Sequence, residues 1–222
     1  MPINIPAYQR LVQELNPAEV TLVAVSKTKP ASDVQELYDL GHRDFGENYV
    51  QELSEKYELL PKDIRWHFIG HLQTNKAKYI VPFVYLIHGI DSLKLLVEVN
   101  KQAGKNNRVI DCLLQMFIAQ EETKFGLDDE ELDEIITQYN HGNFPNIRLR
   151  GLMAMATLTD DKEQIRREFA HLRSLYDRYK DKLPAWDMLS MGMSADYPIA
   201  LEYGSNMVRI GSMLFGEWVY AK

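Results

Sequence analysis

The sequence has very little cysteine: Cys112 is the only thiol in 222 residues. One thiol cannot form an intramolecular disulfide, and a zinc site built on paired cysteines is excluded as well. Cys112 stands beside Leu113 and Leu114, a setting more typical of a small core residue than of a nucleophile. The 45% of residues that are hydrophobic are enough for one sizeable core.

The sequence also lacks a long apolar run and an excess of basic residues. No stretch approaches the roughly 18–20 apolar residues that span a bilayer, and the N-terminus shows no signal peptide, so we expect a cytoplasmic protein without a membrane partner. The net charge of −7 argues against a general nucleic-acid binder, although it leaves room for a local phosphate pocket.

What the sequence does contain is a regular alternation of short apolar runs with amphipathic segments. Several runs lack polar alternation, which is typical of parallel strands that are buried on both faces. The runs are Val20–Lys27, Asp44–Asn48, Arg65–Gly70, Tyr85–Asp91, Cys112–Ala119, Arg148–Ala156, Met188–Ser194 and Met207–Phe215. A count of eight favours a closed (β/α)8 barrel of the TIM type, spanning residues 1–222 as one domain, over an open doubly wound sheet. The absence of a GxGxxG motif after the first run also weakens the dinucleotide-binding form of the open sheet.

Helix signals occupy the segments between these runs. Three pairs have the spacing of a capping box, in which a side chain caps the helix three residues upstream of an acid or amide. They are Ser32 with Gln35, Asp128 with Glu131, and Asp160 with Glu163. The first predicts a helix over Asp33–Leu40 that Gly41 ends, and Pro2–Leu15 predicts an extra N-terminal helix before the first strand.

Functional side chains of such barrels lie at the C-terminal ends of the strands, and Lys27 ends the first run. Partial burial there would lower the pKa of its amine and free it to attack an aldehyde. The alternative is a lysine that extends its head group to solvent. Lys29, which follows the strand and precedes Pro30, is expected to face solvent.

The last two runs resemble a phosphate-binding cup. Ser194 precedes a possible helix start, and Gly211 with Ser212 offers a backbone N–H group and a hydroxyl. The plainer interpretation is that Ser194 caps a helix and that Gly211 simply ends a strand.

Arg209 stands inside the eighth run, where a buried guanidinium needs an acceptor. Either a neighbouring carboxylate or a ligand atom can supply it. His67 and His71 have the spacing of a helical zinc pair, but they fall on a strand and its exit, so we expect no metal site there.

Six segments, in order along the chain, resemble the YggS/PROSC family of pyridoxal phosphate homeostasis proteins. They are VAVSKTKP at 23–30, FGENYVQE at 45–52, WHFIGHLQTNK at 66–76, KFGL at 124–127, LSMGMSADY at 189–197 and VRIGSMLFG at 208–216. Together they cover nearly the whole chain. One departure occurs at His71, where many relatives carry proline or glycine.

The resemblance implies a barrel similar to the N-terminal domain of alanine racemases, with pyridoxal 5′-phosphate (PLP) bound as a Schiff base. Its lysine corresponds to Lys27, and Arg209 corresponds to the arginine that faces the pyridine nitrogen. The remaining positions matched to cofactor contacts are Ser194, Gly211 and Ser212 at the phosphate, Asn48 near the ring, and Ser190 as a weaker candidate. Lys124 corresponds to a possible second PLP-reactive lysine.

The sequence has three candidate functions. The first is a PLP carrier and regulator, without meaningful turnover, that acts in intracellular PLP homeostasis as a monomer with at most transient contacts to PLP-dependent or PLP-synthesising enzymes. The second is a PLP-dependent amino-acid racemase, which would need a second base and, in this barrel type, a second domain for which the chain leaves no residues. The third is a phosphosugar-binding barrel with Lys27 as an aldolase-type lysine. The sequence favours the first.

Overall fold

A computed structural model describes residues 3–120 and 125–216 of the chain. Its centre is a closed barrel of eight parallel strands in which each strand pairs with its sequence neighbours and β1 pairs with β8. The strands are β1 (Thr21–Val25), β2 (Asp44–Glu47), β3 (Arg65–Phe68), β4 (Leu86–Ile90), β5 (Ile110–Gln115), β6 (Ile147–Met153), β7 (Met188–Met193) and β8 (Met207–Ile210). Each lies within or overlaps one of the eight apolar runs, so the predicted (β/α)8 barrel is confirmed.

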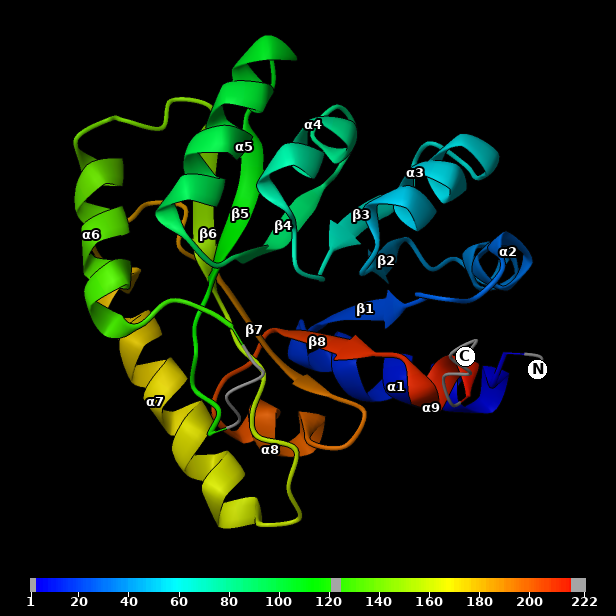
Figure 1. Ribbon diagram of the computed structural model, residues 1–222. Coiled ribbons are helices and arrows are strands. Elements are labelled where there is room, and N and C mark those ends of the chain that lie inside the picture. Colours follow the sequence, from blue (N-terminus) through cyan, green and yellow to red (C-terminus); the bar gives the residue numbers. More distant parts are fainter. Residues whose placement is uncertain (1–2, 121–124, 217–222) are drawn as a thin grey trace.

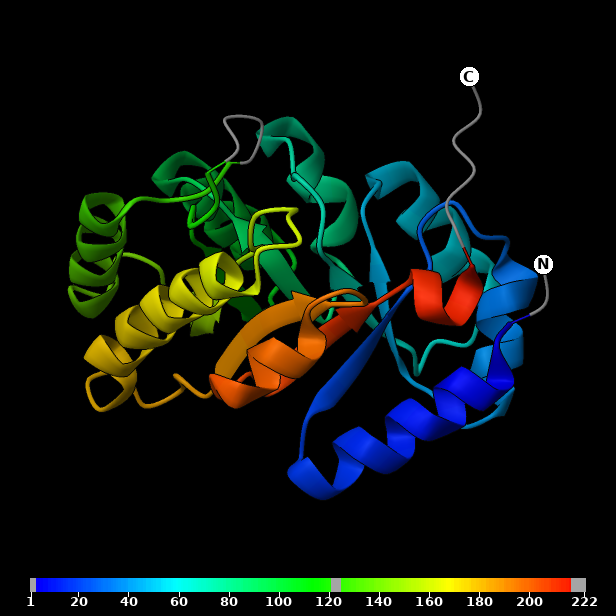
Figure 2. The same ribbon diagram turned by 90° about the horizontal axis from the view of Figure 1, so that it is seen from below.

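Helices lie on the outer side of these strands (Figures 1 and 2). They are α1 (Ile5–Leu15), α2 (Ala31–Asp39), α3 (Val50–Leu59), α4 (Ala77–Ile80), α5 (Leu93–Lys105), α6 (Asp129–Asn140), α7 (Lys162–Lys180), α8 (Tyr197–Glu202) and α9 (Ser212–Phe215), with short 3-10 helices η1 (Asn16–Ala18) and η2 (Thr74–Lys76). The extra N-terminal helix α1 is confirmed; it begins after Asn4, whose side chain accepts a hydrogen bond from the Ala7 N–H group.

Two apolar layers result from the alternation of side chains along each strand. Side chains that point outward pack against the helices in one large core, and Cys112 is buried in it, as expected. Side chains that point inward form a smaller apolar cluster of Val23, Leu86, Leu113, Met153 and Met207. The barrel interior is therefore a packed core rather than a pore.

The capping predictions have mixed outcomes. Asp128 and Glu131 form a complete capping box at the start of α6. The Ser32 prediction is wrong, because α2 begins earlier at Ala31, after Pro30, and Ser32 lies inside its first turn. The cap of α7 is Asp161 rather than Asp160, and its carboxylate accepts from the N–H groups of the next helical turn.

The end of α2 follows the prediction more closely. Gly41 adopts a φ of 96°, a left-handed conformation that glycine tolerates without steric cost, and its N–H group donates to the Tyr38 carbonyl. This turn directs the chain away from α2 and into β2.

The pairing of β1 with β8 brings the two ends of the barrel sequence together. Val23 pairs with Arg209 and Ala24 with Ile210 in the parallel register. Figure 1 shows α9 beside α1, and the Asn4 N–H group donates to the Leu214 carbonyl. Lys29 was expected to face solvent, but this prediction is wrong: its Nζ donates to the Phe215 carbonyl at 2.8 Å, because the turn after β1 directs it toward α9.

Within residues 3–120 and 125–216, no helix is long and apolar enough to cross a membrane. The same residues contain no cluster of three or more histidine, cysteine or acidic side chains placed to hold a metal ion. His67 lies inside the barrel and His71 lies exposed beside Asp91, so the two side chains are not brought together.

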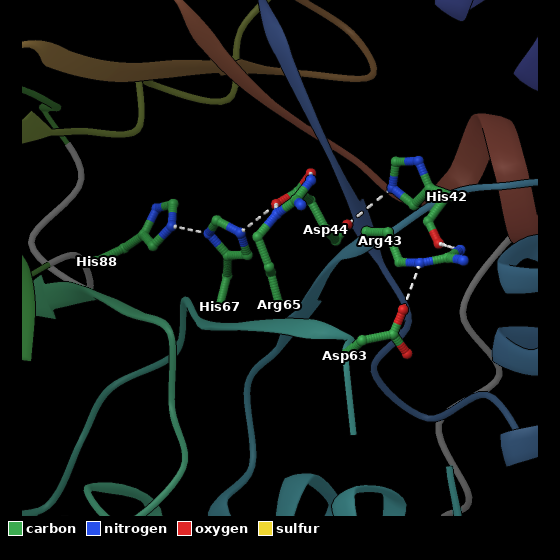
Figure 3. Close-up of polar contacts among 7 residues, drawn as sticks. All are labelled: His42, Arg43, Asp44, Asp63, Arg65, His67 and His88. Atoms are coloured by element: carbon green, nitrogen blue, oxygen red, sulfur yellow. Dashed lines mark hydrogen bonds and ion pairs between the residues drawn. The ribbon is translucent and has the colours of Figure 1, made fainter. Parts of the chain in front are cut away.

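His42 is a buried histidine between α2 and β2. Its ring packs edge-on against Tyr8, at 5.5 Å between centroids, and against Phe45 at 5.1 Å. Its Nε2 donates to the Asp44 carbonyl at 2.8 Å (Figure 3). Burial lowers the pKa of this imidazole to about 4.

This depressed pKa predicts a loss of stability in acid. At a pH between about 4 and 6.5, His42 is protonated in the unfolded chain but not in the folded chain. The contribution of His42 to the free energy of unfolding is therefore fully present above pH 6.5 and is lost as the pH falls toward 4. The loss from this group should reach roughly 3 kcal/mol. His42→Gln should reduce the fall in unfolding free energy between pH 7 and pH 4.5, as measured by urea denaturation. His141→Gln, which removes an exposed imidazole, is the matched control, and equal pH dependence in the two variants would contradict the prediction.

Candidate functional site

A pocket of about 350 Å³ opens at the C-terminal ends of the strands. It brings together six of the seven residues predicted for the site, which come from the ends of β1, β2, β7 and β8. Its lining consists of Val25, Lys27, Asn48, Ile69, Met155, Leu158, Met193, Ser194, Ala195, Arg209, Gly211 and Ser212. Ser190 is the predicted residue that does not line it.

Lys27 is half-buried in a turn that directly follows β1. The Lys29 N–H group closes this turn by donating to the Ser26 carbonyl at 3.1 Å. Thr28 adopts a φ of 59° in it, and a β-branched residue in this left-handed region carries strain of about 1–3 kcal/mol. The surrounding contacts therefore impose the backbone conformation that directs Lys27 toward the pocket.

Arg209 lines the pocket and is only 3% exposed. One terminal nitrogen donates to the Ser190 carbonyl at 2.9 Å and to the Ser190 hydroxyl at 2.6 Å. The other donates to the Ala154 carbonyl at 2.9 Å. The sequence predicted that a carboxylate or a ligand atom would accept from Arg209. The structure shows two backbone carbonyls and a hydroxyl as the acceptors instead. Burial lowers the pKa of the guanidinium to about 10, although Asp196 opposes the shift, so it remains charged at neutral pH.

Ser194, Gly211 and Ser212 lie on the two loops that follow β7 and β8. Asp196, not Ser194, occupies the N-cap position of α8, so a capping role for Ser194 is excluded. The Asp196 carboxylate instead accepts from the Met193 N–H group at 2.6 Å, which fixes the turn that carries Ser194. Gly211 caps α9, and Ser212 is its first residue.

Asn48 follows β2 and lines the pocket. Because β2 and β8 lie on the two sides of β1, Asn48 lies across β1 from Gly211 and Ser212. Among the described residues, its buried Oδ1 atom has no hydrogen-bond partner. Gly70 packs directly against it: a Cβ atom at Gly70 would collide with the Asn48 carbonyl and lie 2.7 Å from the Asn48 Cα atom. Close backbone packing therefore holds Asn48 in place.

Two predicted residues lie elsewhere. Ser190 is fully buried in the barrel interior, behind Arg209, and accepts the hydrogen bond already described. Lys124 lies outside the described residues. The roles of both stay predictions.

Sequence comparison places these observations in a family. The family described as "Alanine racemase, N-terminal domain" matches residues 7–218. The chain is 44% identical over 204 residues to the pyridoxal phosphate homeostasis protein of Aquifex aeolicus, covering 90% of this chain and 87% of that protein. It is 40% identical over 214 residues to the protein of the same name from Escherichia coli K12, covering 93% and 89%. The chain belongs to this family of pyridoxal phosphate homeostasis proteins.

Solved structures agree with the family's fold. PipY of Synechococcus elongatus PCC7942, solved without PLP, superposes with a TM-score of 0.89 at 34% identity, covering 95% of this chain and 99% of that chain. PipY with PLP bound gives a TM-score of 0.86 at the same identity and coverage. An alanine racemase from Bartonella henselae shares the fold, with a TM-score of 0.71 at 17% identity, and the chain covers 58% of its length.

The structure also reveals a buried charge cluster that sequence reasoning missed. Lys56 on α3 donates to Glu47 at 2.6 Å, to the Ser26 carbonyl at 2.7 Å and to Glu52 at 2.8 Å. The Ser26 hydroxyl donates to the same Glu47 oxygen at 2.6 Å. Because Ser26 precedes Lys27 and Glu47 precedes Asn48, the cluster fixes the backbone of two pocket residues.

No sequence signal would have singled out Lys56, because a lysine within an amphipathic helix is usually exposed. Burial raises the pKa of Glu47 to about 7 against the opposing charge of Lys56. Its second carboxylate oxygen has no hydrogen-bond partner among the described residues. Lys56 is therefore the main group that stabilises a charge on Glu47.

Replacement of Lys56 by methionine should destabilise the protein by roughly 3–5 kcal/mol at pH 8, because it leaves a buried carboxylate without its cation. The cost should shrink at pH 5.5, where Glu47 is protonated. Urea denaturation at the two pH values measures both effects. The double variant Lys56→Met/Glu47→Gln should recover much of the loss. Lys101→Met, at an exposed i,i+3 pair, is the control, and an equal cost for the two lysines would contradict the prediction.

Proposed function

We propose that this chain binds PLP in the pocket at the C-terminal ends of the strands and serves in intracellular PLP homeostasis. The observation that carries the proposal is the convergence of an amine, Lys27, and a buried guanidinium, Arg209, in one pocket of this family's barrel. The names of the curated relatives and the PLP-bound PipY structure support the choice of cofactor.

The residues present fit such a cofactor. Lys27 would supply the amine that bonds covalently to the aldehyde. The guanidinium has five N–H groups, and the hydrogen bonds to Ser190 and Ala154 occupy three of them, so two remain to meet the pyridine nitrogen. Asn48, on the same pocket, has a buried oxygen without a hydrogen-bond partner in residues 3–120 and 125–216.

The phosphate would lie against the hydroxyls of Ser194 and Ser212 and the backbone of Gly211. These groups are neutral, and hydroxyl and N–H donors can hold a dianion without a cluster of lysines. Ser190 contacts Arg209 from behind the pocket, so we propose that it supports the ring contact indirectly.

When bound, PLP supplies an electrophilic aldehyde and a ring that can withdraw electrons from an attached amino acid. Arg209 remains charged at neutral pH, and a cation beside the ring nitrogen opposes protonation of that nitrogen. Among the described residues that line the pocket, only Lys27 and Arg209 are ionisable. A racemase needs a base on each face of its substrate, so we propose that the protein holds and transfers PLP without meaningful turnover. The monomeric state, the cytoplasmic location and transient contacts with PLP-using enzymes stay predictions.

The point of attachment can be tested by chemical trapping. Borohydride reduction of the PLP-loaded protein should fix the cofactor covalently, and peptide mass spectrometry should find it on Lys27. Lys27→Met should abolish the label, whereas the matched variant Lys29→Met should keep it, because Lys29 is engaged by the Phe215 carbonyl. Label found solely on Lys29 or Lys124 would overturn the assignment.

The absence of turnover is a separate prediction. PLP-loaded protein incubated with a panel of L-amino acids should yield negligible D-isomer or keto acid, because general acid–base assistance contributes about 10²–10⁴-fold and one of two bases is lacking. Chiral chromatography measures the products. The same protein should restore activity to a PLP-free enzyme. Turnover at roughly 1–10³ per second, the usual enzyme range, would favour the racemase alternative.

A further inference from the structure

A line of hydrogen-bonded side chains runs through the barrel interior, from the pocket to the opposite end of the strands. Arg209 on β8 donates to the Ser190 hydroxyl on β7 at 2.6 Å, and Ser190 Oγ lies 3.3 Å from His88 Nδ1 on β4. His88 Nε2 lies 2.9 Å from His67 Nδ1 on β3. His67 Nε2 lies 3.1 Å from the carboxylate of Asp44 on β2. Figure 3 shows His88, His67 and Asp44 in line, with Arg65 beside Asp44.

This line is almost sealed from water. Ser190, His67 and His88 are 0% exposed, and Asp44 is 8% exposed. Polar groups buried to this degree must satisfy one another, because the loss of hydration is costly. The five side chains come from five different strands, so only barrel closure brings them together.

The carboxylate determines the direction of every proton in the line. Asp44 can only accept when it is ionised, so His67 must donate from Nε2. When His67 carries a single proton, its Nδ1 accepts, which requires His88 to carry its proton on Nε2 and to accept at Nδ1 from the Ser190 hydroxyl. The Ser190 oxygen is left to accept from Arg209, as its 2.6 Å contact shows.

The charges around the line support this order. Burial raises the pKa of Asp44, but hydrogen bonds from Arg65 and His67 outweigh it and hold the pKa well below its usual range. Burial lowers the pKa of His88 well below that of a free imidazole, so this ring carries a single proton. The groups that face the two rings are Asp44, Arg65, Tyr85, Ser190 and Arg209.

We propose that Asp44, His67, His88 and Ser190 are positioning residues for Arg209: the carboxylate orders the protons of the line so that the Ser190 oxygen accepts from the guanidinium. Arg209 is thereby held through its terminal nitrogens against the barrel wall, at the pocket that it lines. The line itself does not depend on the cofactor, but its effect on PLP rests on the proposed function.

The first test uses the protein without PLP and reads the histidine tautomers by nitrogen-15 NMR. Both His67 and His88 should be neutral with the proton on Nε2. Asp44→Asn allows an amide donor to face His67, and it should move both protons to Nδ1, as the equivalent change does in a serine protease triad. Arg65→Gln is the matched control, because it removes the ion pair and leaves the carboxylate that orders the line. A proton on His88 Nδ1 in the unaltered protein would overturn the proposal.

The second test asks whether the positions of the protons along the line affect the Arg209 side chain. Its side-chain Nε–H resonance, again without PLP, should shift in Asp44→Asn and in Ser190→Ala. It should stay in place in Ser205→Ala, which removes a buried hydroxyl that bonds backbone carbonyls of the same two strands but does not touch Arg209. If Asp44→Asn fails to fold, Ser190→Ala with its control decides. An unmoved resonance in Ser190→Ala would refute the positioning role.

The third test uses PLP and separates this proposal from the proposed function. Ser190→Ala should weaken PLP binding about tenfold, as expected for the loss of one hydrogen bond to a charged group, and it should shift the visible absorption band. Neither effect should appear when the same change is made in an Arg209→Ala background, because the two residues act as a unit. Full effects in that background would refute the proposal. The lack of any visible band in the unaltered protein would instead refute PLP binding. The two NMR tests, which use no PLP, would still decide whether the line positions Arg209.

Discussion

The parallel pairing of β1 with β8 is the constraint on which the site depends. It places Val23 opposite Arg209 and so brings Lys27, four residues further along the chain, to the same pocket as Gly211 and Ser212. The contacts beyond the strands extend the same junction, since Lys29 bonds the end of α9 and the N-terminus of α1 bonds Leu214. An open sheet with the same strands would leave Lys27 and Arg209 on opposite edges.

The barrel interior contains both an apolar cluster and a line of hydrogen-bonded polar side chains. One part is filled by the Val23, Leu86 and Leu113 side chains and their neighbours, as in other small barrels. The other part contains the line from Asp44 to Arg209, in which each group satisfies the next. Networks of this kind specify a unique arrangement only when they are complete, because a single missing partner leaves a buried group without hydrogen bonds. The guanidinium in the pocket is thus anchored by groups that never reach the pocket.

Much of this architecture could be predicted from local patterns. The eight strands follow from eight apolar runs, and the capping box at Asp128 follows from spacing alone. The caps at Ser32 and Asp160 could not be placed, because Pro30, two residues before Ser32, and Asp161, one residue after Asp160, offered better helix starts. Lys27 and Arg209 could be singled out by their positions at strand ends and by resemblance to the family.

The remaining features depend on contacts between distant residues. From the sequence alone, Lys56 is expected to be a surface lysine. Its burial depends on the packing of α3 against Glu47 and Ser26. His67 and His88 are separated by 21 positions, and nothing in either segment indicates that their rings meet inside the barrel. Ser190 was predicted to contact the cofactor directly. Only the position of the Arg209 side chain shows that Ser190 lies behind it, outside the pocket lining.

The junction of the first and last strands also has a bearing on how the molecule is made. During synthesis Lys27 leaves the ribosome long before Arg209, and the strand that carries it has no partner on one side until β8 is complete. Such closure between distant segments forms late, because the whole intervening chain must first be ordered. A ligand that bridges β1 and β8 can bind only the finished barrel, so it stabilises that state by mass action. Cofactor capture would then mark the completion of folding, and a truncated or misassembled chain would leave the cofactor in solution.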